Sequence, residues 1–198
     1  AGAVTVSGIV VDETANPVSD AVILVGTISD SGRREGKSQN DGTFSITGCP
    51  PSKQFVTANA QGYAATTLEI NLGENANALR LIVRSGKTLR LRVVDAQGNP
   101  ISKATVWYDC INRGWDDKDS VPVQLDFSPA TDEQGQIVLT NAPDCEMKLT
   151  ARASGFLNAQ EIRIRPDDAE HLITLSKALM VHGKVYDEST GKRIPKFR

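Results

Sequence analysis

Short apolar runs alternate with polar, turn-forming clusters along the whole chain. Residues 8–11 and 21–25 are apolar and rich in β-branched side chains, whereas residues 43–46 and 55–60 alternate apolar with polar positions. The cluster at 12–17 combines Asp, Asn and Pro, which favour chain reversal for different steric and hydrogen-bonding reasons. The pattern predicts short, half-buried strands that are joined by tight turns.

The chain contains an internal repeat. Residues 8–23 align with 91–106 at an offset of 83, and residues 40–50 align with 133–143 at an offset of 93. The change in offset (93 − 83 = 10) places an insertion of ten residues in the second repeat, between residues 106 and 131.

The alignment predicts three units. The first covers residues 1–85, the second covers 86–178 with an inserted loop at 107–130, and a third, incomplete repeat begins in 179–198. Asp12, Asp95 and Asp187 fall at equivalent places, so each is expected to accept hydrogen bonds from backbone amides of its turn.

The fold class predicted from this pattern is all-β, with tandem antiparallel seven-stranded β-sandwiches and an incomplete third repeat. Val, Ile and Thr account for 17, 13 and 15 residues of the 198, which favours strands over helices. Ala21 and Ala104 are expected in narrow cores. A single helical turn is expected at 166–171, where Asp167 or Asp168 would cap the turn and His171 would end it.

The repeat unit resembles the carboxypeptidase regulatory-like domain. The residues that carry the resemblance lie in seven segments of the chain: 8–12, 16–21, 93–106, 131–137, 142–143, 153–156 and 181–195. The resemblance implies that each sandwich is of prealbumin-like or Ig-like type and has no catalytic residues. It also implies non-enzymatic spacer or accessory modules in a larger exported bacterial protein, located in the periplasm, at the cell surface or outside the cell. The expected partners are other domains of the parent protein or an envelope protein.

Composition excludes several classes of function. The 22 basic and 24 acidic residues nearly balance, so the net charge of -2 offers no electrostatic footprint for nucleic acid. No apolar run approaches 18 residues, so no membrane insertion is expected from this segment. The start at Ala1, without Met or a signal peptide, suggests a processed or trimmed terminus. The third repeat is expected either to be truncated or to be completed by a partner that adds strands.

The inserted loop is the main departure from the repeat and carries the alternative functional hypothesis. Its aromatic and acidic residues could bind a carbohydrate or a peptide, and the candidate residues are Trp115, Trp107, Tyr108, Asp116, Asp117 and Asp119. In the competing structural interpretation, Trp107 and Trp115 cover the open end of the sandwich.

No metal, cofactor or catalytic site is predicted. The acidic residues of the loop lack the Gly and Glu that an EF-hand requires, and no C-x-x-C motif is present. The three cysteines are Cys49, Cys110 and Cys145. The sequence leaves open whether they are free thiols or whether Cys110 and Cys145 form a disulfide.

Overall fold

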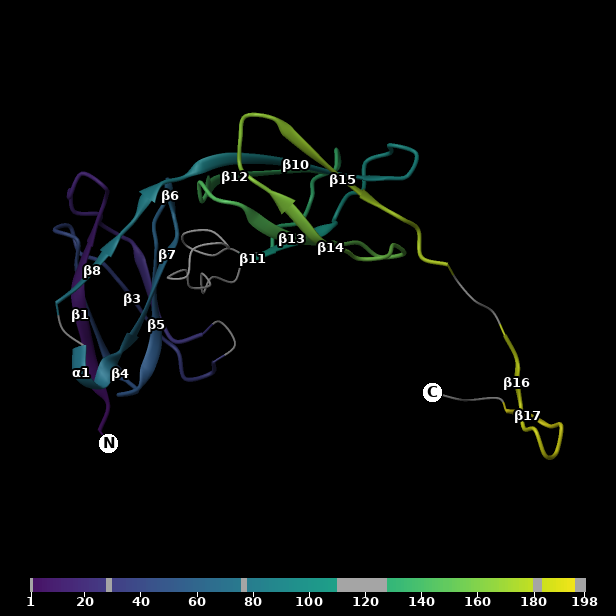
Figure 1. The fold of residues 1–198 in the computed structure, drawn as a ribbon, viewed down its shortest axis with the longest axis horizontal. Coiled ribbons are helices and arrows are strands. Elements are labelled where there is room, and N and C mark those ends of the chain that lie inside the picture. Colours follow the sequence, from purple (N-terminus) through teal and green to yellow (C-terminus); the bar gives the residue numbers. More distant parts are fainter. Residues whose placement is uncertain (1, 28–29, 76–77, 110–127, 180–182, 195–198) are drawn as a thin grey trace.

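A computed structural model describes residues 2–27, 30–75, 78–109, 128–179 and 183–194 of the chain (Figure 1). Strands dominate these residues, and the only helix among them is a single turn, α1. The expected all-β class is therefore confirmed. Two hydrophobic cores are present, and we call the bodies around them the first and the second sandwich.

The first sandwich packs a three-stranded sheet, of order β4-β1-β8, against a four-stranded sheet, of order β3-β2-β5-β7. A two-stranded ribbon, β6-β9, closes the end that faces the second sandwich. The elements are β1 (Val4–Val11), β2 (Val22–Val25), β3 (Arg34–Lys37), β4 (Thr43–Cys49), β5 (Lys53–Asn59), β6 (Tyr63–Ala64), β7 (Thr66–Asn71), α1 (Leu72–Asn75), β8 (Leu79–Ile82) and β9 (Arg84–Ser85).

The second sandwich repeats this arrangement, with sheets of order β12-β10-β15 and β11-β13-β14. The counterpart of β3 would fall within 110–127, outside the described residues. A hairpin of two strands follows, and among the described strands each of the two pairs with the other alone. The elements are β10 (Lys87–Asp95), β11 (Thr105–Asp109), β12 (Gln136–Ala142), β13 (Met147–Arg152), β14 (Ala159–Ile164), β15 (Glu170–Leu175), β16 (Val185–Tyr186) and β17 (Arg193–Ile194).

Alternation along the strands builds both cores. Phe44 and Ile46 of β4 point inward, as do Ile137 and Leu139 at the equivalent places in β12. Burial of such apolar side chains is worth about 1.5–3 kcal/mol each, so two cores of this kind supply the main driving force for folding. Ala21 and Ala104 are fully buried, as expected from the repeat.

The expectation of purely antiparallel sheets was wrong in one respect. In each sandwich the first strand pairs in parallel with the last, β1 with β8 and β10 with β15. A parallel pair requires a crossover rather than a hairpin, and in the first sandwich the chain reaches β8 from β7 of the opposite sheet through α1.

The expected helical turn at 166–171 was also wrong. Asp167 accepts a hydrogen bond from the amide of Ala169 at 2.9 Å, which forms a local turn instead of a helix cap. His171 lies in β15, opposite Leu91 of β10, and its Nε2 is 2.9 Å from Asp167 Oδ1. Asp167 therefore accepts a local hydrogen bond, as a cap would, but the segment leads into a strand instead of a helical turn.

Candidate interaction surface

The aspartates that repeat along the chain form turns. Asp12 Oδ1 accepts hydrogen bonds from the amides of Thr14 and Asn16, both at 2.9 Å. Asp95 Oδ1 accepts equivalent bonds from the amides of Gln97 and Asn99, also both at 2.9 Å. The predicted equivalence of these positions is confirmed.

The third repeat forms the same kind of turn with one more residue. Asp187 Oδ1 accepts a hydrogen bond from the amide of Thr190 at 2.7 Å, and the Asp187 amide donates to Lys192 O rather than to the fourth residue along. Hydrogen bonds from the Thr190 and Ser189 hydroxyls lower the pKa of Asp187 to about 2. The pKa values of Asp12 and Asp95 are lowered as well, chiefly by side-chain hydrogen bonds from Thr14 and Asn99 respectively. These carboxylates are therefore occupied in backbone turns.

The outer surface of sheet β11-β13-β14 carries the one predicted binding residue whose side chain is described. Trp107 lies in β11 opposite Thr150 of β13, and its side chain is 36% exposed. The guanidinium carbon of Arg152 lies 4.7 Å from the centre of the Trp107 ring. This is cation–π geometry, which fixes a flexible arginine over a rigid aromatic plane. We call Trp107, Thr150 and Arg152 the Trp107 surface.

Arg152 was not predicted as a site residue. It follows Thr150 by two positions, so it points to the same side of β13, and it pairs with Thr105 across the ladder. Its contact with Trp107 is a diagonal one between neighbouring strands. Only the register of β11 against β13 brings the two residues together, and periodicity alone does not reveal a register.

Ion pairs surround the Trp107 surface. Lys148 Nζ is 3.3 Å from Glu161 Oε2, and Arg163 Nη1 is 2.9 Å from Glu146 Oε1. Within the part of the chain that the structure describes, no carboxylate lies within ion-pair distance of Arg152. Among the described side chains of this surface, the exposed guanidinium of Arg152 is therefore the charge without an ion-pair partner.

The other predicted binding residues cannot be placed at this surface. Tyr108 lies in β11 opposite Leu149, and its side chain is outside the described set. Trp115, Asp116, Asp117 and Asp119 fall within 110–127, outside the described residues, and so does Cys110. The hypotheses of an aromatic and acidic binding loop and of a Cys110–Cys145 disulfide both remain predictions.

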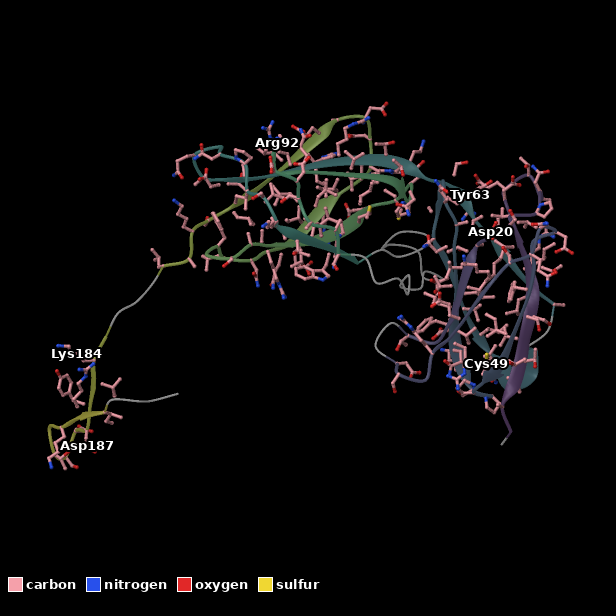
Figure 2. The ribbon with its side chains drawn as sticks, turned by 180° about the vertical axis from the view of Figure 1, so that it is seen from behind. Asp20, Cys49, Tyr63, Arg92, Lys184 and Asp187 are labelled. Atoms are coloured by element: carbon pink, nitrogen blue, oxygen red, sulfur yellow. The ribbon has the colours of Figure 1, made fainter. Side chains whose placement is uncertain are left out.

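The thiol of Cys49 is fully buried in the first core, among the side chains at one end of the first sandwich (Figure 2). Burial raises the pKa of Cys49, which disfavours the reactive thiolate. Cys145 is half-buried in the turn between β12 and β13. Among the described residues no group of three His, Cys, Asp or Glu side chains could hold a metal ion.

A cleft of about 540 Å³ lies between the two sandwiches. Its walls combine small apolar side chains with hydroxyls, one cation and one anion. The lining residues are Ala64, Ala65, Thr66, Ile82, Arg84, Ser85, Pro143, Asp144 and Cys145. The charged lining residues already have partners, since Arg84 pairs with Glu13, and Asp144 with Lys87 and Arg165. Among the described lining residues, the cleft therefore offers no unpaired charge to a ligand.

Comparison with known proteins identifies the class of the first sandwich. Residues 5–83, which form most of the first sandwich, match the model of the carboxypeptidase regulatory-like domain. The resemblance inferred from the repeat motifs is thereby confirmed there. No curated protein matches the chain.

Solved structures with a similar arrangement include three bacterial proteins. The Streptococcal ancillary pilin shares 11% identity at a TM-score of 0.41, over 89% of this chain and 62% of that one. The Bacillus anthracis TIE protein shares 15% identity at a TM-score of 0.35, over 98% and 41%. The shaft pilin SpaA from Lactobacillus rhamnosus GG shares 11% identity at a TM-score of 0.40, over 91% and 100%. The chain thus spans less than two thirds of the first two proteins.

The described residues include no helix with the length and apolar character needed to cross a membrane.

Proposed function

We propose that the chain is a non-enzymatic spacer within a larger extracytoplasmic bacterial protein, and that it holds successive modules at a fixed angle. The observation that carries this proposal is the junction at Gly86, whose backbone contacts both sandwiches at once. A spacer with a defined shape needs such a junction, because a flexible linker would let its modules turn independently.

On one side, Gly86 is bound to the first sandwich. Its amide donates a hydrogen bond of 3.0 Å to Gly62 O, next to the β6-β9 ribbon in which Tyr63 pairs with Ser85. The chain therefore leaves the first sandwich as part of a hydrogen-bonded ribbon.

On the other side, Gly86 lies against β12 of the second sandwich. A Cβ atom at this position would lie 2.5 Å from Asn141 Cα and 2.8 Å from Thr140 O, well inside van der Waals contact. Glycine permits this close backbone approach because it has no side chain. A larger residue would have to push the start of β10 away from β12.

Two exposed ion pairs flank the junction. Arg84 Nε is 3.3 Å from Glu13 Oε1 in the first sandwich, and Lys87 Nζ is 3.8 Å from Asp144 Oδ2 in the second. Exposed pairs of this kind contribute little free energy. Each pair lies within one sandwich, so it ties one end of the linker to that sandwich and does not bridge the junction.

The chain leaves the second sandwich through hydrogen bonds equivalent to those at the first junction. The amide of Ala178 donates a hydrogen bond of 2.9 Å to Gly155 O, and Phe156 pairs with Lys177 in an isolated bridge. These bonds correspond to those of Gly86, Tyr63 and Ser85 at the first junction. Their recurrence supports a chain built for regular attachment of modules, which agrees with the export and the envelope partners implied by the family.

Residual dipolar couplings on the full chain test the proposal. One alignment tensor should fit the amide couplings of both sandwiches. The Gly86→Val variant should require two different orientations, whereas Gly98→Ala, in a turn with no atom near the added Cβ, should leave the common tensor unchanged. Independent tensors in the wild-type chain, or a common tensor that survives Gly86→Val, would overturn the fixed-angle spacer.

A further inference from the structure

We propose that the Trp107 surface binds an extended, acidic segment of a partner protein. This interaction goes beyond the spacer function and does not depend on it. The chemistry that defines the partner is a carboxylate that meets Arg152, flanked by an aliphatic side chain that packs on Trp107.

The repeat provides an internal comparison for this surface. Leu24 and Thr57 hold the positions of Trp107 and Thr150 in the first sandwich, since Leu24 pairs with Thr57 as Trp107 pairs with Thr150. Leu24 is 8% exposed and Thr57 is fully buried, whereas Trp107 is 36% exposed and Thr150 is half-buried. The same side of the fold is thus covered in one sandwich and open in the other.

The open surface also differs in chemistry. The position of Arg152 is occupied in the first sandwich by Asn59, which pairs with Val22 as Arg152 pairs with Thr105. Where the first sandwich has Leu24 and Asn59, the second sandwich therefore has a large aromatic ring and a cation. Arg and Trp are the residue types most enriched among the dominant contacts of protein interfaces.

Charge selects the partner. The neighbouring cations Lys148 and Arg163 are already paired with Glu161 and Glu146, so among the described side chains of this surface Arg152 is the cation without an ion-pair partner. Stacking on Trp107 holds the guanidinium in place and leaves its N–H donors at the edge of the plane, where a carboxylate can accept two parallel hydrogen bonds. Preorganisation of this kind lowers the entropy lost on binding.

The same stacking favours a peptide over a sugar. A sugar ring binds by lying flat on an aromatic face, and the guanidinium of Arg152 covers one face of Trp107. An extended peptide instead places alternate side chains on the same side, roughly 6.6 Å apart, which lets one carboxylate and one aliphatic group reach two neighbouring sites.

The test uses the full chain with Trp115→Phe, so that Trp107 is the sole reporter of tryptophan fluorescence. The probe is a blocked heptapeptide that alternates glutamate and valine, and a lysine–valine peptide of equal length is the charge control. We expect a saturable change in Trp107 fluorescence with the glutamate peptide only. Amide shifts of Thr105, Thr150 and Arg152 in the wild-type chain should follow the same curve.

Two variants test the two residues of the Trp107 surface separately. Each replaces one of them with the residue that the first sandwich carries at the same position. Arg152→Asn should weaken binding roughly tenfold or more, which is the effect of losing a charged hydrogen bond. Trp107→Leu, followed by amide shifts, should weaken binding as well. Arg90→Ser, which also installs the residue of the first sandwich, is the matched control and should leave the affinity unchanged.

Three outcomes would overturn the proposal. They are the absence of a saturable response, an equal response to the lysine peptide, and unchanged binding by Arg152→Asn. A response to cellohexaose that survives Arg152→Asn would replace the peptide site with a carbohydrate site. None of these results would alter the dipolar couplings that test the spacer function.

Discussion

The hydroxyl groups of Ser38 and Thr131 make the same two hydrogen bonds in the two sandwiches. Ser38 Oγ accepts from the amide of Ala21 at 2.9 Å and donates to Val18 O at 2.7 Å. Thr131 Oγ1 accepts from the amide of Ala104 at 2.9 Å and donates to Ile101 O at 2.7 Å. Both side chains are almost completely buried. One hydroxyl in each sandwich therefore satisfies a buried amide and a buried carbonyl before the second strand.

Removal of this hydroxyl should be costly. Thr131→Val keeps the shape of the side chain but leaves the Ala104 amide and the Ile101 carbonyl without their partner. We expect a loss of about 1–3 kcal/mol in the free energy of unfolding, the usual cost of an unsatisfied buried polar group. Thr131→Ser retains the hydroxyl that Ser38 provides and should lose less. Urea denaturation measures both, and an equal loss for the two variants would contradict the role of the hydroxyl.

Gly135 should be more sensitive to substitution than Gly98, although both have a left-handed backbone, with φ of 74° and 83°. Gly98→Ala should cost about 1–2 kcal/mol, the penalty of that conformation for a side chain. Gly135→Ala should cost more, because its Cβ would lie 2.6 Å from Val93 O, whereas no atom lies within 4 Å of the Cβ at Gly98. Equal denaturation midpoints for the two variants would show that the close approach is unimportant.

Ala104→Leu should overpack the second core. Ala104 is fully buried in the second core, so three additional heavy atoms would force side chains or backbone to shift, at a cost of roughly 1–3 kcal/mol. Ala96→Leu, at an exposed turn position, is the control and should melt like the wild-type chain. A wild-type melting temperature for Ala104→Leu would mean that the core has room to spare.

The stability of the turn in the third repeat should change with pH only in a strongly acidic range. Because the pKa of Asp187 is lowered to about 2, the carboxylate contributes its full stabilisation above the ordinary aspartate pKa of about 3.9. This contribution is lost only as the pH falls through about 2. Carboxyl carbon shifts should show this midpoint for Asp187, and Thr190→Val should move it upward. A wild-type midpoint near 4 would contradict the turn geometry.

Local sequence was sufficient for the repeat, the strands and the turns, because each of these is encoded within a few residues. Asp12 and Asp95 illustrate this, since Asp, Asn and Pro at fixed spacings define a turn without reference to the rest of the chain. The parallel pairing of β1 with β8 could not be predicted in the same way. Strand direction depends on how the chain crosses between sheets, and alternation is identical in parallel and antiparallel neighbours.

The interaction surface was predictable only in part. Trp107 stands out as a large aromatic residue in an aliphatic sequence. Arg152 does not stand out, because it is one of many surface cations and becomes distinctive only through its place above Trp107. The internal repeat did contain a usable signal, since aligning Arg152 with Asn59 and Trp107 with Leu24 shows two changes of chemistry on one side of the sheet.

The parallel pairing of first and last strands determines how each sandwich responds to tension. The chain enters at the start of β1 and leaves at the end of β8, so the two points of attachment lie at opposite ends of one ladder. A pull along the polypeptide therefore acts as shear, and it loads the paired segments Gly8–Val11 and Leu79–Ile82 together rather than opening them one bond at a time. In the second sandwich the corresponding ladder extends over Arg90–Asp95 and Glu170–Leu175, which distributes the same load over a greater length.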